Sequence, residues 1–192
     1  DEGVNAFLDG IVSALREMRE RGVRPAALLV DTVFSSDGVC GERPGFLAQA
    51  ADIVRSYGGL FIADEVQAGF GRTGESLWGF LRHGVVPDLV TLGKPMGNGY
   101  PVAGVVGRPA LFANFGARTR YFNTFGGTPV ACAAAAAVLR IIEQQQLRQN
   151  AAAIGAMLLQ AFRARANPRK GIGDVRGVGL FVGVDIVDPD GH

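Results

Sequence analysis

Two kinds of apolar pattern alternate along the first half of the chain, and this alternation limits the folds that it can adopt. Apolar residues recur at helical spacing near residues 4–20 and again over 45–57. A short, mainly apolar stretch follows each of them, at 26–33 and 60–63. Such runs are typical of strands buried on both faces, and alternation of helices with buried strands favours a parallel sheet covered by helices. The sequence therefore predicts an α/β fold.

The direction of the later strands follows from the length of one connection. A short helix is expected at 76–82, a third buried strand at 89–92 and a fourth at 102–106. The fourth is separated from Lys94 by the seven residues 95–101, whereas a crossover to a parallel neighbour takes about a dozen or more. If these two strands are neighbours, they run antiparallel. We expect a mostly parallel sheet with one antiparallel strand and flanking helices.

The second half of the chain is richer in alanine and is expected to be mainly helical. Helices are predicted at about 129–144 and 147–166, and a further strand at 178–186. The segment 167–171 has the composition of a linker, so a domain boundary is expected close to residue 168. The sequence begins just before a helix and stops just after a strand, which indicates a segment of a longer protein.

Composition argues for small-molecule chemistry. The formal net charge is +1 and acids and bases are interspersed, so neither a nucleic acid nor a membrane surface is an expected partner. Cys40 and Cys132 are far apart, and His83 and His192 add no metal-ligand spacing, so we expect neither a disulfide framework nor a metal site. The acidic start lacks the pattern of a signal peptide. These features predict a cytoplasmic protein.

A carboxylate and an amine follow two of the predicted strands. Asp64 comes directly after the run 60–63, and Lys94 follows the run 89–92 after one glycine. Ligands of parallel α/β sheets bind beyond the carboxyl ends of the strands, so both side chains should face one crevice. Taken alone, the pair could be no more than a partly buried ion pair.

The two residues stand inside longer sequence stretches, which read FIADEVQAGFGRTG over 61–74 and PDLVTLGKPMGNGYP over 87–101. Two more stretches follow in order, YFNTFGGTP over 121–129 and GDVRGVGLFVG over 173–183. Together they resemble the signature stretches of class III, fold-type I aminotransferases, which depend on pyridoxal 5′-phosphate (PLP). The resemblance covers nearly the whole chain.

The resemblance implies a fold and a cofactor. The fold would be the PLP-transferase fold of type I, with residues 1–168 forming part of the large PLP-binding domain and 169–192 starting the small C-terminal domain. Lys94 would be the Schiff-base lysine, and Asp64 would keep the pyridine nitrogen protonated so that the ring can act as an electron sink. Once displaced by a substrate amine, Lys94 could also move a proton at the substrate carbon.

The resemblance also assigns roles to three further residues. Val66 would pack on one face of the pyridine ring, Gln67 would hydrogen-bond the 3-oxygen of the ring, and Thr124 would reach the cofactor phosphate of a neighbouring subunit. The last role implies a homodimer with shared active sites. Without the resemblance, the same residues would be read as a core valine, a solvated loop glutamine and a turn threonine. Glu65 matches the family as well, with an expected structural role.

One glycine pattern competes with this interpretation. The residues from Gly69 to Gly74 satisfy G-x-G-x-x-G, the dinucleotide-binding fingerprint. That fingerprint starts at the end of a strand and opens a long helix, whereas four residues, 64–67, intervene here, and the acidic residue expected about 20 positions later is absent. We interpret these glycines as a tight loop at the mouth of the pocket.

The chain departs from the family pattern on the substrate side. Many members carry a Glu-Pro pair followed by a glutamine and often by a second glutamate, whereas this chain has Asp31-Thr32, then Phe34, and Ser36 near the second glutamate position. A glycine-serine phosphate loop, a stacking aromatic residue and a C-terminal substrate arginine would lie outside residues 1–192.

The resemblance supports an enzyme that moves an amino group between an amine or ω-amino acid and a 2-oxo acid. The stretches that begin at Gly93 and Tyr121 are especially similar to the phospho-lyases of the family, which eliminate phosphate from amino-alkyl phosphates such as phosphoethanolamine. A PLP-dependent phospho-lyase is therefore an alternative function. A truncated, non-catalytic module that kept the fold is a second alternative, although the presence of both Lys94 and Asp64 speaks against it.

Overall fold

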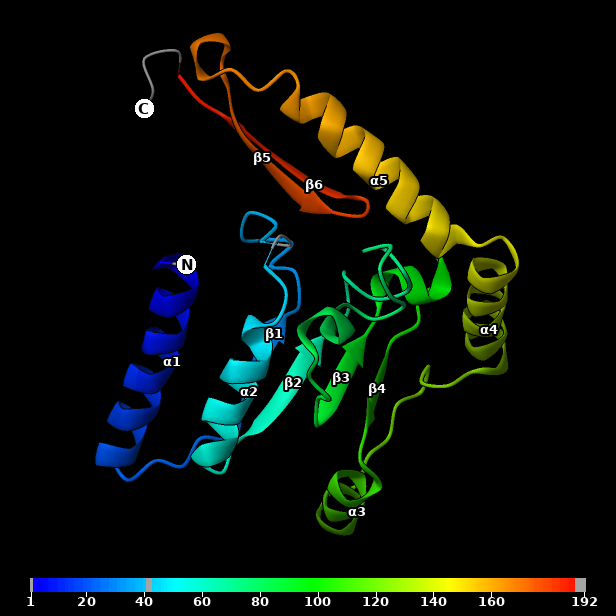
Figure 1. Ribbon diagram of the computed structural model, residues 1–192. Coiled ribbons are helices and arrows are strands. Elements are labelled where there is room, and N and C mark those ends of the chain that lie inside the picture. The colour runs from blue at the N-terminus through cyan, green and yellow to red at the C-terminus, as the bar shows by residue number, and fades with distance from the viewer. Residues whose placement is uncertain (1, 41–42, 189–192) are drawn as a thin grey trace.

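A four-stranded mixed sheet forms the centre of the first half of the chain. In the computed structural model, which describes residues 2–40 and 43–188, the strands lie in the order β1 (Ala27–Asp31), β2 (Leu60–Asp64), β3 (Leu89–Leu92) and β4 (Gly104–Gly107) (Figure 1). Strands β1, β2 and β3 are parallel. Strand β4 pairs antiparallel with β3, in a register that places Thr91 opposite Val105. The predicted mostly parallel sheet with one antiparallel strand is confirmed.

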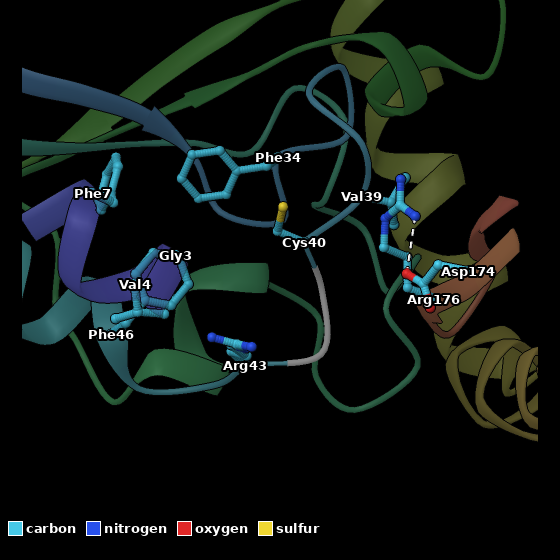
Figure 2. Close-up of a pocket in the computed structure, with 10 residues that line it drawn as sticks. All are labelled: Gly3, Val4, Phe7, Phe34, Val39, Cys40, Arg43, Phe46, Asp174 and Arg176. Carbon is cyan, nitrogen blue, oxygen red and sulfur yellow. Dashed lines mark hydrogen bonds and ion pairs between the residues drawn. The ribbon is translucent and has the colours of Figure 1, made fainter. Parts of the chain in front are cut away.

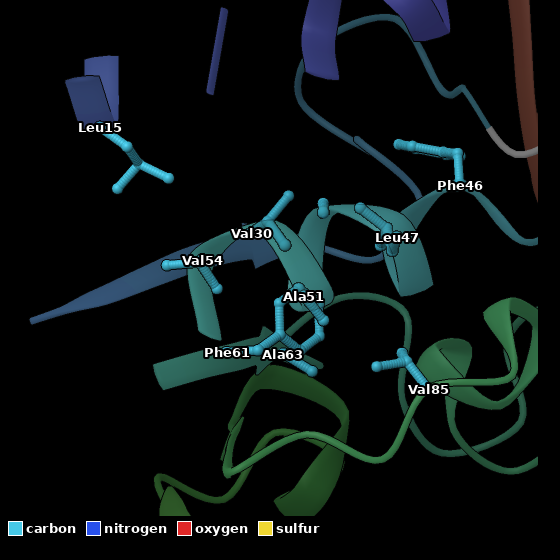
Figure 3. Close-up of a cluster of buried hydrophobic side chains, with 10 residues drawn as sticks. Leu15, Val30, Phe46, Leu47, Ala51, Val54, Phe61, Ala63 and Val85 are labelled. Atoms are coloured by element: carbon cyan, nitrogen blue, oxygen red, sulfur yellow. The ribbon is translucent and has the colours of Figure 1, made fainter. Parts of the chain in front are cut away.

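Two amphipathic helices cover one face of this sheet. Helix α1 (Glu2–Glu20) packs on α2 (Phe46–Ser56), and α2 packs on β1 and β2. Their apolar stripes meet the strands in a cluster of buried side chains (Figure 3). Phe61 and Leu47 are fully buried there, and burying a side chain of this size contributes about 1.5–3 kcal/mol. This core fixes the position of the carboxyl end of β2.

The second half supplies three helices and a two-stranded hairpin. The helices are α3 (Pro109–Arg118), α4 (Pro129–Gln144) and α5 (Leu147–Arg163). After the short 3-10 helix η3 (Pro168–Lys170), β5 (Ile172–Val178) and β6 (Phe181–Ile186) pair antiparallel. Helix α5 lies along both strands of this hairpin (Figure 1).

Two local predictions were wrong, and one helix was not predicted. The helix expected at 76–82 is a 3-10 helix, η1 (Gly79–His83). The strand expected at 178–186 is broken after Val178 by a turn at Gly179, whose φ of 54° is left-handed, so the hairpin begins earlier than expected. Helix α3 was not anticipated, because it buries no residue and so leaves no core-facing apolar pattern.

The hairpin turn sits tightly against the rest of the fold. The amide of Leu180 donates to the carbonyl of Arg72 at 3.1 Å. A Cβ atom added to Gly155 of α5 would overlap the carbonyl group of Gly179, and one added to Gly74 would lie 2.6 Å from the Cα atom of Ala152. Glycine is therefore required at both contacts, because any side chain would push the hairpin, α5 and the loop 69–74 apart.

The division at residue 168 stays a prediction, and His192 with the rest of 189–192 lies outside the described residues. Within the described residues, none of the helices is both long enough and apolar enough to cross a membrane.

Candidate active site

Asp64 closes strand β2 beside Thr91, its partner in the parallel register. Its Oδ1 atom accepts hydrogen bonds from the amide of Val66 at 2.9 Å and from the Thr91 hydroxyl at 3.0 Å. Within the described residues, Oδ2 of Asp64 has no hydrogen-bond donor. The carboxylate is thus oriented through one oxygen and offers the other to a ligand.

Lys94 opens the 3-10 helix η2 (Lys94–Gly97) directly after β3, and α4 packs on this helix. Its side chain is exposed, and across residues 2–40 and 43–188 its amine forms neither a hydrogen bond nor an ion pair. Lys94 and Asp64 lie at the carboxyl ends of neighbouring parallel strands, as the sequence predicts. They do not form the ion pair that the simpler interpretation required.

A cleft of about 420 Å³ brings three of the predicted site residues together, namely Val66, Gln67 and Lys94. Val66 also lies against the residue before Lys94, since a Cβ atom on Gly93 would be 3.4 Å from Val66 Cγ1. The other residues that line the cleft include Arg72 and, from the hairpin, Leu180 and Phe181. Asp64 and Thr124 are outside this lining.

Gln67 is tied to the loop that follows β1. Its Nε2 atom donates to Ser36 Oγ at 3.0 Å. Asp31, at the end of β1, organises the start of that loop by accepting from the amides of Val33 and Ser35, each at 2.9 Å, and from the Ser35 hydroxyl. Asp31 stands where many class III sequences have glutamate, and its carboxylate stabilises the loop through these hydrogen bonds.

Glu65 has the structural role that the sequence suggested. It is fully buried and accepts from the amides of Gly79 and Phe80, each at 2.8 Å, and from the Thr32 hydroxyl at 3.0 Å. The pKa of its carboxyl group is raised, because the effect of burial exceeds that of these hydrogen bonds, which lower the pKa. The Glu65 side chain joins the ends of β1 and β2 to η1 and does not line the cleft.

His83 extends this buried polar network. The Gly45 amide donates to its Nδ1 atom at 3.1 Å, so the neutral ring carries its proton on Nε2, which lies 2.9 Å from the carbonyl oxygen of Thr32. Burial lowers the pKa of the imidazole. Protonating Nδ1 would break the bond to Gly45, which locks the ring in its neutral form.

The glycine-rich segment 69–74 is a loop and opens no helix, in agreement with the sequence argument against a dinucleotide site. Its left-handed residues Phe70, Gly71 and Gly74 turn the chain toward α5 and the hairpin. Arg72 from this loop lines the cleft.

Thr124 lies on an exposed segment between α3 and α4 that carries three solvent-facing aromatic side chains. The exposed fractions are 73 % for Tyr121, 85 % for Phe122 and 84 % for Phe125. Three exposed aromatic side chains within five residues are uncommon on a protein surface, so the segment has the properties of a contact surface.

A separate cavity of about 430 Å³ lies between α1, the loop after β1 and the hairpin. Figure 2 shows Phe7, Phe34 and Phe46 on one side of it and Arg176 with Asp174 on the other. None of the predicted site residues lines this cavity.

Sequence reasoning missed Thr91, Ser36 and Arg72. The hydroxyl of Thr91 could have been found from the parallel register of the strands that carry Asp64 and Lys94. Ser36 was noted only as a departure from the family pattern on the substrate side. Neither its bond to Gln67 nor the place of Arg72 in the cleft leaves a local signal, because both depend on how the loops fold back.

Comparison with known proteins decides the family. The profile of the aminotransferase class-III family matches residues 4–192. The chain belongs to this family.

The chain resembles both aminotransferases and phospho-lyases of class III. Human mitochondrial alanine–glyoxylate aminotransferase 2 is 41 % identical over 162 residues, which cover 84 % of this chain and 32 % of the relative. An Arthrobacter phospholyase solved in complex with phosphoethanolamine superimposes with a TM-score of 0.91 at 40 % identity, over 98 % of this chain and 44 % of that one. The chain thus spans about a third of the length of its human relative.

Class III enzymes are fold-type I proteins that depend on PLP, and this chain is consistent with a fragment of that fold. The ornithine aminotransferase of Toxoplasma gondii, solved with partial occupancy of PLP at its active site, matches with a TM-score of 0.83 at 32 % identity, over 95 % of this chain and 42 % of that one. The residues described above fit such a cofactor: among the described residues, Lys94 offers an amine without a partner, and Asp64 a carboxylate oxygen without a donor.

Proposed function

We propose that the protein containing this chain is a PLP-dependent aminotransferase that moves an amino group between an amine or ω-amino acid and a 2-oxo acid. The proposal rests on one observation. Lys94 and Asp64 lie at the ends of neighbouring strands without pairing with each other, and Val66 and Gln67 lie beside Lys94 in one cleft.

The residues of the chain would divide the work as follows. PLP, when bound, supplies an electron sink for the bonds of the substrate carbon. Lys94 would hold the cofactor covalently, and its amine, when free, would move a proton at the substrate carbon. Asp64 would keep the ring nitrogen protonated through Oδ2, because Thr91 and the Val66 amide already hold Oδ1. Val66 would pack on the ring, and Gln67 would donate to its 3-oxygen.

The proposal includes a homodimer in which Thr124 reaches the cofactor phosphate of the other subunit. The aromatic segment around Thr124 supports this arrangement, because a second copy would cover Tyr121, Phe122 and Phe125.

A phospho-lyase is the second candidate, favoured by the likeness to the Arthrobacter phospholyase. The charged side chains that line the cleft, Arg72 and Lys94, are both basic, which would suit a phosphate leaving group. The loop after β1 carries Ser36 where two-substrate transaminases often have an acid. Amine transaminases without that acid are also known in the family, so the aminotransferase remains our first choice.

One experiment separates the two reactions. The full-length protein is incubated with phosphoethanolamine in the absence of any 2-oxo acid. We expect no sustained phosphate release under these conditions, and turnover of amines only when a 2-oxo acid is added. Release of inorganic phosphate and aldehyde over many turnovers would instead establish the phospho-lyase.

A second measurement tests whether the protein uses PLP at all. Protein mixed with PLP should show a visible absorbance band that borohydride removes, and Lys94→Ala should lose both this band and all turnover. Lys170, which ends the exposed 3-10 helix η3, offers a matched control, and Lys170→Ala should keep both. A colourless wild-type protein would point to the non-catalytic module.

A further inference from the structure

The β5–β6 hairpin contacts the loop after β1 through Arg176. Its Nη1 atom donates to Asp174 at 3.1 Å and its Nη2 atom to Asp185 at 2.9 Å, one carboxylate on each strand, and its Nε atom donates to the Gly38 carbonyl. The guanidinium is thus held by its own hairpin and directed at the loop. Figure 2 shows the Arg176 side chain beside Val39, with the bond to Asp174 dashed.

The loop and the hairpin approach each other closely at this contact. A Cβ atom added to Gly183 of β6 would lie 3.3 Å from the Gly38 oxygen and 3.6 Å from the Cβ atom of Val39. The planar fork of arginine reaches three acceptors at once, which a lysine amine at the end of a flexible stem does not reproduce.

The loop itself is held in an unusual conformation. Phe34 and Val39 both have left-handed backbones, with φ of 52° and 59°, although neither is a glycine. Residues in this region persist where their surroundings force them, and such positions cluster at functional sites. Here the forcing contacts are Asp31 at the start of the loop and Arg176 near its end.

Between these two anchors lies Ser36, the residue that accepts from Gln67. The amide nitrogen of Gln67 has two protons. Ser36 takes one of them at 3.0 Å, and the second remains for a ligand in the cleft that Gln67 shares with Lys94. The hairpin is therefore linked to the cleft through the loop: Arg176 binds the Gly38 carbonyl, the backbone leads from Gly38 to Ser36, and Ser36 accepts from Gln67.

We infer that Arg176 is a positioning residue, through which the hairpin orients the Gln67 amide toward the 3-oxygen of the cofactor. This inference rests on the proposed function, because it needs PLP in the cleft. It assigns to the hairpin a second task besides contributing Leu180 and Phe181 to the lining.

The test follows the visible band of bound PLP in the full-length protein as a function of pH. A hydrogen bond to the charged 3-oxygen shifts the titration midpoint of that band, and its loss in Gln67→Ala should move the midpoint by about one pH unit. Arg176→Ala should move it in the same direction by at least about half a unit. The double variant Gln67→Ala/Arg176→Ala should move it no further than Gln67→Ala alone.

Two further variants complete the design. Arg169→Ala removes an exposed arginine that precedes the same hairpin, and its midpoint should equal that of the wild type. Ser36→Ala removes the hydrogen bond between Gln67 and the loop and leaves the hairpin unchanged. It therefore tests the inference even if Arg176→Ala does not fold. We expect it to shift the midpoint in the direction of Gln67→Ala.

The outcomes separate this inference from the proposed function. A midpoint that moves in Gln67→Ala but stays at the wild-type value in Ser36→Ala, or in a folded Arg176→Ala, overturns the positioning role and leaves the proposed function intact. A midpoint unchanged in Gln67→Ala overturns the role of Gln67 and the inference with it, although Lys94 keeps its assignment. A wild-type protein without a visible band refutes both.

Discussion

Asp64 depends on its neighbour across the sheet for its orientation. The two hydrogen bonds that it accepts from described residues end on Oδ1, one from the Val66 amide and one from the Thr91 hydroxyl. A carboxylate held through one oxygen loses its rotational freedom before a ligand arrives, so less free energy is spent on ordering it when the ligand binds.

Asp64→Asn should keep the covalent cofactor and lower kcat by at least about a hundredfold, because a neutral amide does not hold the ring nitrogen protonated. Borohydride trapping and steady-state kinetics measure the two effects. A rate close to that of the wild type would remove Asp64 from its role.

Thr91→Val removes one hydrogen bond from the Asp64 carboxylate and keeps the shape of the side chain. We expect kcat to fall by about five- to tenfold, which corresponds to about 1 kcal/mol. Thr91→Ser retains the hydroxyl and serves as the control. Equal rates in the two variants would contradict a role for the hydroxyl.

His83 should make the stability of the fold depend on pH. Burial holds its pKa below the ordinary 6.5, so below that pH the unfolded chain binds a proton that the folded chain excludes. Stability is therefore lost as the pH falls through 6.5, by up to about 1.4 kcal/mol per pH unit. Arg82 lowers the same pKa further, whereas the hydrogen bond to Thr32 and the charge of Glu75 raise it.

The contribution of His83 is isolated by comparing the wild type with His83→Gln in thermal unfolding at several pH values. Glu65 has a raised pKa, so its contribution runs the opposite way and is lost as the pH rises, and it remains in both proteins. The melting temperature of the wild type should fall more steeply below pH 6.5 than that of the variant. Parallel curves would show that His83 does not titrate as argued.

The sequence revealed Asp64 and Lys94 because each stands at the end of an apolar run, and the family stretches added Val66, Gln67 and Thr124. It did not reveal Thr91, Ser36 or Arg176. Their contacts join segments far apart in the chain, and no local periodicity encodes which loop lies against which strand.

The strands and the long helices were predictable because their apolar residues follow a local pattern. The apolar runs that form β1, β2 and β3 and the stripes of α1 and α2 record which side chains the core buries. Helix α3 shows no such pattern, because it buries no side chain. The hairpin turn at Gly179 shows none either, because its position depends on a close contact with α5.

The packing of the hairpin on α5 can be tested at two helical glycines, where alanine should change the free energy of unfolding in opposite directions. Gly155→Ala would overlap the carbonyl of Gly179 and should lower the free energy of unfolding by about 1–3 kcal/mol. Gly10→Ala in α1 meets no atom within 4 Å and should raise it by about 0.5–1 kcal/mol through better helix propensity. Chemical denaturation measures both, and equal shifts would argue against the tight junction.

The assembled protein offers a test of shared active sites. Thr124→Ala and Lys94→Ala chains should each be inactive alone. If Thr124 serves the other subunit, a mixed dimer has one site with both lesions and one with neither, so mixing should restore activity. A monomer in solution that still binds PLP tightly would contradict the dimer.

The walls of the cleft beside Lys94 come from segments that lie far apart in the sequence. Val66 and Lys94 follow strands β2 and β3 of the central sheet, whereas Leu180 and Phe181 belong to the hairpin. A ribosome exposes the first pair long before the second, so a nascent chain possesses the lysine well before it possesses the cleft. We therefore expect cofactor capture to be a late event in biosynthesis, and an interrupted translation product to leave its reactive amine in open solvent.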